Sequence, residues 1–445
     1  MRILTFRKGG VHPPESKFTK DKRIETMEEV EEVLVPLHQH TGAPAQPLVK
    51  PKDTVKKGQK IGDSDAKVTS PVHSPISGEV VKLVETTLPN SRKSVAVLIK
   101  NDHEEIWDDS VKPRNDVDSL SREDLLKIIR ETGIVGLGGA AFPTHIKLMP
   151  PPNFPVDTLI INGAECEPYL TGDYRLMLEE GESVIKGVEI LTRILGVKKT
   201  FIGVEENKSD AAVSLDKIVH SMGLDKDIEV VLLRTKYPQG SEKHLIKAIT
   251  GREVPSGGLP FHVGCIVQNV GTTYAIKRAV YDGVPLIERV ITVSGSGVME
   301  PKNLKVRIGT IASHVIEFCG GARENIKKII FGGPMMGFSA YTLDLPVIKG
   351  TSGILLFTDQ ELIEYEEYPC IRCGRCVDAC PMGLMPLFID GYSRMGDFDK
   401  AEEFRALDCI ECGSCAYVCP SKRHLVQSIR MAKTEIIKKR KAVRK

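Results

Sequence analysis

The chain has 445 residues, which is enough for about three or four domains that each bury a hydrophobic core. Its 61 basic and 59 acidic residues leave a formal charge of +2, and no basic stripe interleaved with aromatic residues occurs, so the composition excludes an evident nucleic-acid partner. The amino terminus lacks the apolar run of a signal peptide and no later run approaches about 18 apolar residues, so we expect no transmembrane segment and only peripheral membrane association.

The first 110 residues predict a small all-β domain, because they are rich in turn residues and contain short alternating runs such as 79–84 and 94–99. Two segments, 49–62 and 74–80, resemble the barrel-sandwich domain of lipoyl- and biotinyl-type proteins. In that family a lysine on the hairpin between the two segments carries a swinging cofactor. Lys67 lies on this hairpin but the carrier signature is missing. We therefore interpret residues 1–110 as a docking module.

A glycine-rich segment follows a predicted helix. Ser121, two acidic residues and an apolar repeat predict a capped amphipathic helix. Beyond it come Gly136, Gly138 and Gly139, and then Lys147. Packed glycines let backbone N–H groups approach a phosphate, which a nearby lysine can neutralise. A glycine-rich turn is more often only a turn, so this segment alone leaves both interpretations open.

The next buried strand is predicted at 157–163, and the carboxylates Glu165 and Glu167 follow it. Carboxylates at the carboxyl edge of an α/β sheet are placed to hold ribose or ribityl hydroxyls, although a solvated loop would carry them equally well. Strand and helix patterns continue to alternate beyond this point. We predict an α/β domain over residues 118–285.

Four motifs in this domain resemble, in the same order, the flavin and NADH site of the flavoprotein subunit of respiratory complex I. They are residues 136–147, 162–168, 237–242, and 259–261 with 268–272. The resemblance implies an FMN phosphate cradle at Gly136, Gly138, Gly139 and Lys147, flavin contacts at Asn162 and Glu165, positions near flavin and nicotinamide at Glu167, Tyr237 and Glu242, and the rest of the pocket at Gln268, Asn269 and Thr272.

Four positions depart from that family's pattern. They are Ala141, Ala164, Ser241 and Gln268. A chain that has lost FMN and serves only as a non-enzymatic wiring and docking protein is therefore an alternative to an FMN- and NADH-binding enzyme subunit.

A hairpin and a helix are predicted after the α/β domain, over 290–310 and 311–319. The pattern resembles the soluble-ligand-binding β-grasp domain that follows the flavin domain in the same family, and we place it at residues 286–345. Members of that class can bind small ligands, including corrinoids. We prefer a spacer that sets the distance from flavin to clusters.

The pattern C-x2-C-x2-C-x3-C-P occurs twice, and each cysteine of the second copy follows its counterpart by 39 residues. Three closely spaced thiolates hold three corners of an iron–sulfur cube, whereas the fourth points away and serves the other cluster. Structural zinc would need only two Cys-x-x-Cys pairs and no trailing Cys-Pro. We predict two [4Fe–4S] clusters over residues 355–432. The first is assigned to Cys370, Cys373, Cys376 and Cys419, and the second to Cys380, Cys409, Cys412 and Cys415.

Three cysteines remain, Cys166, Cys265 and Cys319, and free thiols beside clusters indicate a reducing compartment. A basic tail at 433–445 predicts contact with an anionic membrane surface or an acidic partner, or else a solvated disordered segment.

The order of these modules resembles that of the RnfC proteins of Rnf complexes, membrane-bound ferredoxin:NAD+ oxidoreductases coupled to ion transport. The resemblance implies a multidomain α/β and α+β chain at the cytoplasmic face of the inner membrane. It would exchange electrons between NAD(H), FMN, two [4Fe–4S] clusters and the other subunits, with ferredoxin or another iron–sulfur subunit as a partner. Cobalamin reductases of bacterial microcompartments contain similar modules, but their barrel-like domain comes last.

Overall fold

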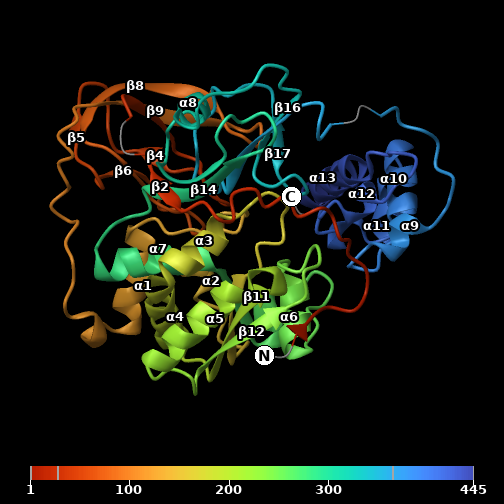
Figure 1. Cartoon of the computed structure of the whole chain (residues 1–445), viewed down its shortest axis with the longest axis horizontal. Helices are drawn as coiled ribbons and strands as arrows, with labels where there is room; N and C mark the ends of the chain where they lie inside the picture. Colours follow the sequence, from red (N-terminus) through yellow and green to blue (C-terminus); the bar gives the residue numbers. More distant parts are fainter. Residues whose placement is uncertain (1–2, 28–29, 363–364, 444–445) are drawn as a thin grey trace.

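The computed structural model describes residues 3–27, 30–362 and 365–443. Its α/β domain is built on a five-stranded sheet with the strand order β1-β12-β11-β10-β13, in which all neighbours are parallel (Figure 1). The strands are β1 (Ile3–Leu4), β10 (Thr158–Gly163), β11 (Lys199–Glu205), β12 (Ile228–Leu233) and β13 (Cys265–Asn269). The alternating strand and helix pattern predicted for this region is confirmed.

Helices cover both faces of this sheet, because its strands are apolar on both sides. Leu159 and Ile161 of β10 face one group of helices, whereas Ile160 faces α6 on the other side. The helices are α1 (Arg122–Glu131), α2 (Thr144–Lys147), α3 (Gly172–Glu179), α4 (Gly181–Leu195), α5 (Ser209–Ser221), α6 (Glu242–Thr250) and α7 (Val270–Tyr281). The side chain of Ser121 accepts a hydrogen bond from the Asp124 N–H at the start of α1, which confirms the predicted capped helix.

The barrel-sandwich domain consists of two small sheets. One has the strand order β3-β9-β8-β5 and the other β4-β6-β7. The strands are β3 (Glu32–Pro36), β4 (Gln46–Pro47), β5 (Thr54–Val55), β6 (Lys60–Asp63), β7 (Val72–His73), β8 (Gly78–Thr87) and β9 (Lys93–Asn101). The two alternating runs noted in the sequence form β8 and β9, as predicted, and Lys67 is exposed between β6 and β7.

The β-grasp domain has a six-stranded sheet with the order β17-β16-β18-β14-β15-β2. Its elements are β2 (Ile24–Thr26), β14 (Glu288–Ser294), β15 (Lys302–Arg307), α8 (Ala312–Phe318), β16 (Lys328–Phe331), β17 (Phe338–Ala340) and β18 (Gly353–Phe357). The predicted hairpin and helix are therefore confirmed. This domain does not have a separate core, because Ile291 and Leu304 belong to the same hydrophobic cluster as Val33 and Ile99 of the barrel-sandwich domain.

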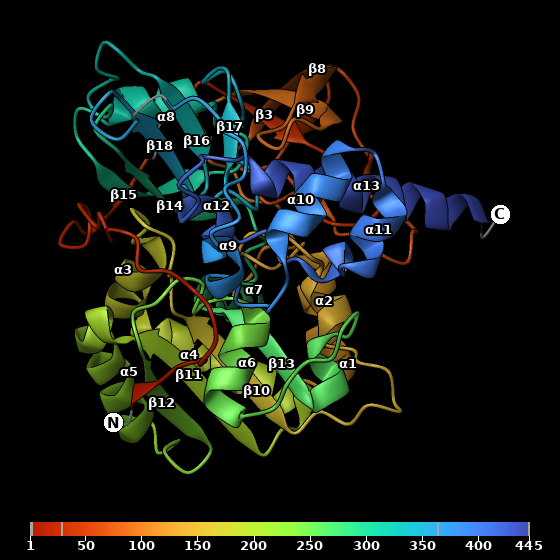
Figure 2. The ribbon, with the colours of Figure 1, turned by 90° about the vertical axis from the view of Figure 1, so that its right-hand side faces the viewer.

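The first strands of the chain lie outside the barrel-sandwich domain that the sequence predicted over residues 1–110. β1 joins the sheet of the α/β domain and β2 joins the β-grasp sheet. Between them runs the N-terminal strap, residues 5–23, which passes over the α/β domain in Figure 2. Its Val11 exchanges backbone hydrogen bonds of 2.8 and 2.9 Å with Tyr237, and the Gly10 N–H donates to the carbonyl of Ala379 at 2.9 Å.

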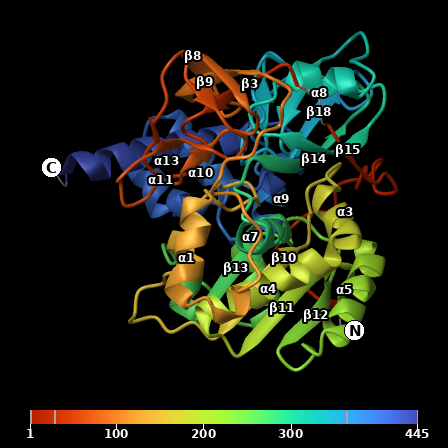
Figure 3. The same cartoon turned by 90° about the vertical axis from the view of Figure 1, so that its left-hand side faces the viewer.

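The cysteine-rich domain is helical and stands beside the α/β domain and the β-grasp domain (Figures 1 and 2). Its helices are α9 (Arg375–Asp378), α10 (Pro386–Arg394), α11 (Phe398–Glu403), α12 (Ser414–Tyr417) and α13 (Leu425–Val443). The helix predicted after Pro420 is confirmed, and it continues into the predicted basic tail, projecting beyond its neighbours (Figure 3). No helix in residues 3–27, 30–362 and 365–443 is long and apolar enough to cross a membrane.

Candidate functional site

The glycine-rich loop has the shape of a backbone cradle at the carboxyl edge of the sheet. Gly139 has φ of +113°, a conformation that favours glycine, and a Cβ built on it would meet no atom within 4 Å. The Gly136 N–H closes the loop by donating to the carbonyl of Phe142 at 2.8 Å. A side-chain-free backbone facing open space is what a phosphate group requires, so the loop fits the phosphate of FMN.

The start of α7 holds this loop from one side. The Leu137 N–H donates to the hydroxyl of Thr272 at 2.8 Å, and a Cβ on Gly138 would lie 3.4 Å from the Cβ of Asn269. Asn269 caps α7 by accepting hydrogen bonds from the N–H groups of Gly271 and Thr272. Four residues that the resemblance assigned to the pocket, Gly136, Gly138, Asn269 and Thr272, are thus brought together.

A buried charge pair lies behind the loop. Arg289 of β14 donates from Nη2 to the carbonyl of Leu137 at 2.6 Å and from Nε to that of Thr351 at 2.8 Å. The Nδ2 of Asn269 donates to the Asp173 carboxylate at 2.6 Å. Burial raises the pKa of Asp173 to about 6 and lowers that of Arg289 to about 10. The sequence did not single out Arg289, because its contact is with a loop 152 residues away.

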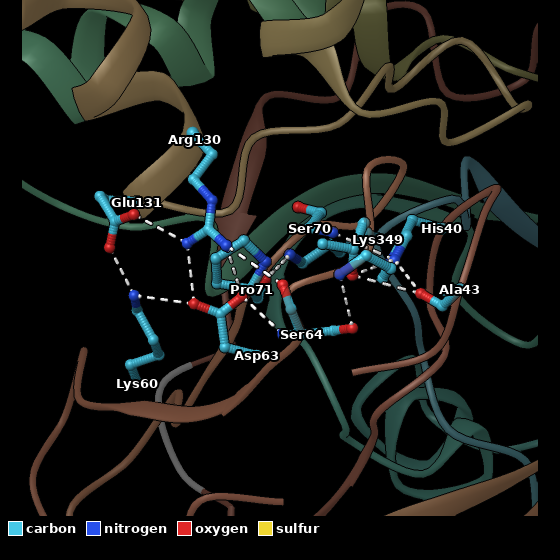
Figure 4. A network of polar contacts seen from close by, with 12 residues as sticks. His40, Ala43, Lys60, Asp63, Ser64, Ser70, Pro71, Arg130, Glu131 and Lys349 are labelled. Atoms are coloured by element: carbon cyan, nitrogen blue, oxygen red, sulfur yellow. Dashed lines mark hydrogen bonds and ion pairs between the residues drawn. The ribbon is translucent and has the colours of Figure 1, made fainter. Parts of the chain in front are cut away.

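The barrel-sandwich domain supports the same loop from below. Thr41 donates its N–H to the carbonyl of Ala141 at 3.1 Å and its hydroxyl to that of Ala140 at 2.8 Å. Close by, the Lys349 ammonium donates to the carbonyls of Pro71 and Gly133, both at 2.7 Å (Figure 4). Three domains therefore meet under the cradle and fix its position.

Two predicted site residues form an ion pair with each other. The Nζ of Lys147, at the end of α2, lies 2.5 Å from Oε1 of Glu242, at the start of α6. Both side chains are partly exposed. A phosphate bound at Lys147 would therefore share its ammonium with Glu242, so the pair can hold one end of a nucleotide while the carboxylate fixes the lysine.

Asn162 and Glu165 are held by the protein backbone. The Asn162 Nδ2 donates to the carbonyl of Gly240 at 2.8 Å. The Glu165 carboxylate accepts from the N–H groups of Asp173 and Tyr174 at 2.7 and 3.1 Å, at the first turn of α3. Glu165 therefore acts on α3, although the resemblance implied that it touches flavin.

Lys17 of the N-terminal strap organises the turn that carries Glu165 and Glu167. Its ammonium donates to the carbonyls of Glu165, Glu167 and Leu170 at 2.9, 2.8 and 2.6 Å. Burial, together with the charge of nearby Lys208, lowers the pKa of Lys17 to about 8. The sequence did not indicate this residue, since a lone lysine in a long irregular segment carries no pattern.

Glu167 and Tyr237 connect the α/β domain to the cysteine-rich domain. The Tyr237 side chain is 2% exposed, and its hydroxyl donates to the carbonyl of Cys412 at 2.8 Å. That hydroxyl also lies 3.4 Å from Glu167 Oε1, while Glu167 Oε2 accepts from the Met335 N–H at 3.0 Å. Burial raises the pKa of Glu167 to about 7. Both residues thus lie next to a cysteine loop.

Gln268 is buried on β13, and its Nε2 has no hydrogen-bond partner among the described residues. An unpartnered buried amide is costly, so a bound group that accepts from it would be favoured. Of the residues that the resemblance assigned to the pocket, this one has a donor free for a ligand.

The eight cysteines of the duplicated motif surround two cavities. The outer cavity, of about 350 Å³ including its opening, is lined by Cys370, Cys373, Cys376 and Cys419. The inner cavity, of about 340 Å³, is lined by Cys380, Cys409, Cys412 and Cys415. Each set of four is the set that the sequence assigned to one cluster.

The thiols of each set surround a space rather than a point. Within residues 3–27, 30–362 and 365–443, no three His, Cys, Asp or Glu side chains converge closely enough to bind a single metal ion. Four thiolates around a cavity suit a cube-shaped cluster, which fills the space between them, better than one zinc ion. The donor set therefore fits [4Fe–4S].

Comparison with known proteins identifies every module. The description "RnfC Barrel sandwich hybrid domain" matches residues 4–104, "Nuo51 FMN-binding domain" residues 129–278, "SLBB domain" residues 290–339 and "4Fe-4S dicluster domain" residues 362–420. The predicted cofactor types, FMN and [4Fe–4S] clusters, are thereby confirmed, whereas the individual binding residues stay predictions. An electron-wiring chain without a flavin domain is not supported.

Two curated relatives cover nearly the whole chain. The RnfC-type component of the proton-translocating ferredoxin:NAD(+) oxidoreductase complex of Clostridium ljungdahlii is 50% identical over 97% of this chain and 94% of its own length. Its counterpart in the Na(+)-translocating ferredoxin:NAD(+) oxidoreductase complex of Acetobacterium woodii is 46% identical over 98% of both. The chain belongs to the RnfC family. The recognition from domain order is confirmed, and the cobalamin reductase alternative is not favoured.

A more distant likeness concerns the fold alone. A chain of an NAD+-reducing [NiFe]-hydrogenase in its H2-reduced state superimposes with a TM-score of 0.50 at 17% identity. The likeness covers 72% of this RnfC chain and 63% of the hydrogenase chain.

Proposed function

We propose that this RnfC chain is the subunit of a membrane-bound, ion-translocating ferredoxin:NAD+ oxidoreductase at which electrons pass between NAD(H) and the iron–sulfur path. The two relatives are named as the corresponding subunits of such complexes. We place the chain peripherally, at the cytoplasmic face of the membrane. FMN, when bound, supplies the conversion between two-electron hydride transfer and one-electron transfer.

The chain's own residues hold the nucleotides. The loop at Gly136, Gly138 and Gly139 cradles the FMN phosphate, and Lys147 neutralises it while Glu242 fixes the lysine. Gln268 offers the donor of its free amide to the same pocket. Glu167 and Tyr237 occupy the path from this pocket to the cysteine-rich domain.

The inner cluster is the one that exchanges electrons with the flavin domain, and the contacts of its cavity support this order. Tyr237 donates to the carbonyl of Cys412 at 2.8 Å, and Nε2 of His244 lies 3.1 Å from the carbonyl of Pro381. The hydroxyl of Ser256 donates to Asp408 at 2.6 Å. At the outer cavity, by contrast, Cys370 and Cys373 are exposed. Electrons from NADH therefore pass from the flavin to the inner and then to the outer cluster.

Anaerobic NADH reduction of two matched variants tests this order by rapid-freeze EPR. Without the inner cluster, in Cys412→Ala, NADH should bleach the flavin but leave the outer cluster oxidised. Without the outer cluster, in Cys373→Ala, the inner cluster should still be reduced at the parental rate. Dithionite reduction of the remaining cluster in each variant shows that it is intact. Reduction of the outer cluster at the parental rate in Cys412→Ala would refute the order.

A further inference from the structure

The two cysteine loops have the same backbone as well as the same sequence pattern. Arg372 and Glu411 occupy equivalent positions and have φ of +56° and +58°. Gly374 and Gly413, also equivalent, have φ of +79° and +80°. The loops are therefore two copies of one structural unit, and a difference in their surroundings reflects what each copy contacts.

The inner loop is covered by the α/β domain and by α13. Ile410 packs against the apolar cluster that contains Val11 and Tyr237. The carbonyl of Cys412 accepts the Tyr237 hydroxyl, and the Glu411 carboxylate pairs with Arg430 at 2.7 Å. An apolar residue, a carbonyl and a charged side chain thus each meet a partner.

The outer loop presents the equivalent groups to solvent. Ile371, the counterpart of Ile410, is 68% exposed. Arg372, the counterpart of Glu411, is exposed and forms no ion pair or hydrogen bond within the described residues, and neither does the exposed Arg375. Tyr365 and Tyr368 are exposed in the segment leading into the loop. The outer loop therefore has the contact groups of a covered surface without the cover.

The charge of this surface indicates its partner. Lys422, whose Nζ lies 4.1 Å from the centre of the Tyr365 ring, adds a third cation beside Arg372 and Arg375. They outnumber the unpaired exposed acids of the same segment, Glu366 and Asp378. A cationic rim around an apolar centre fits a partner that presents carboxylates around its own contact point.

We propose that Ile371, Tyr368, Arg372 and Arg375 form the surface on which an iron–sulfur subunit of the same complex docks, with carboxylates around its cluster. The inference rests on the proposed function and deepens it, because a [4Fe–4S] cluster passes single electrons and its partner must accept them singly. The partner plays for the outer loop the part that the α/β domain plays for the inner one. Its contact therefore includes an apolar pocket for Ile371 and a donor to the carbonyl of Cys373.

The test uses the whole complex purified with variant chains. One variant, Ile371→Asp, removes the apolar centre, and a second, Arg372→Glu with Arg375→Glu, reverses the cationic rim. The control is Val213→Asp, which places a new charge at a 45% exposed apolar residue of α5, in the α/β domain. Three quantities are measured: the amount of this chain that stays with the complex on size exclusion, NADH-driven ferricyanide reduction, and NADH-driven reduction of iron–sulfur centres outside this chain by rapid-freeze EPR.

We expect both variants to dissociate from the complex, or to reduce the outside centres at least tenfold more slowly, while ferricyanide reduction stays within twofold of the parent and the control matches the parent throughout. Variants that stay bound and reduce those centres at the parental rate overturn the proposal, and so does a control that is equally impaired. If only the reaction with added soluble ferredoxin slows, the surface serves that mobile protein and the proposed occupant is wrong. A parent complex in which NADH reduces no ferricyanide would instead refute the proposed function.

Discussion

Replacing Lys17 by methionine tests whether the N-terminal strap organises the flavin site. The variant keeps the aliphatic stem but removes an ammonium that donates to three carbonyls at 2.6 to 2.9 Å. Each carbonyl left without a donor costs about 1–3 kcal/mol, and part of that loss is offset because no charge needs to be buried. We expect the free energy of unfolding of the α/β domain to fall by about 3–5 kcal/mol, the range for a broken buried network.

The same change should weaken FMN binding, because the turn that carries Glu165 and Glu167 is no longer fixed at the carboxyl edge of the sheet. Fluorescence titration of the chain with FMN should give a dissociation constant at least tenfold higher than that of the parent, or about 1.4 kcal/mol. The control is Lys20→Met, since Lys20 lies on the same strap with an exposed side chain. Unchanged FMN affinity in a destabilised Lys17→Met chain would refute a role in the site, and an equal loss in Lys20→Met would refute the assignment to Lys17.

Three further predictions concern single side chains. Cys373→Ala should lower the iron content from about eight to about four atoms per chain, and a full iron content would contradict the ligand assignment. Lys147→Ala should raise the dissociation constant of FMN about tenfold or more, whereas Lys147→Arg should largely restore it; equal affinity in all three chains would exclude the phosphate contact. Burial lowers the pKa of Lys349 to about 7 from 10.5, so the unfolded chain binds more protons between these pH values and Lys349 makes the free energy of unfolding rise with pH there, by up to about 1.4 kcal/mol per unit. Chemical denaturation from pH 7 to 10 should show a shallower rise in Lys349→Met, and an identical slope would contradict the lowered pKa.

The features that the sequence predicted well depend on residues close together in the chain. The cap at Ser121 is local, and the spacing of the cysteines determines which thiols can share a loop. The structure gathers the eight cysteines into the two predicted sets, because each trailing cysteine is carried by its short helix toward the other cavity. Buried strands such as β10 were recognisable from their apolar runs.

The features that the sequence did not predict are contacts over long separations. Lys17 meets carbonyls about 150 residues away, and Arg289 meets Leu137 from another domain. β1 and β2 are two and three residues long, too short for any periodic pattern. The resemblance located the pocket residues, but it could not show that Glu165 caps α3 or that Glu242 holds Lys147, because those choices depend on packing.

The route of the N-terminal strap has a consequence for how the chain is made on the ribosome. β1 and the strap leave the ribosome first, but their partners are β12, Ala379 of the cysteine-rich domain and β15, all made much later. The strap must therefore wait until most of the chain has been translated before it can dock. Lys17 reaches its turn in the same late step, so the flavin site becomes complete only after the domain that will receive its electrons exists.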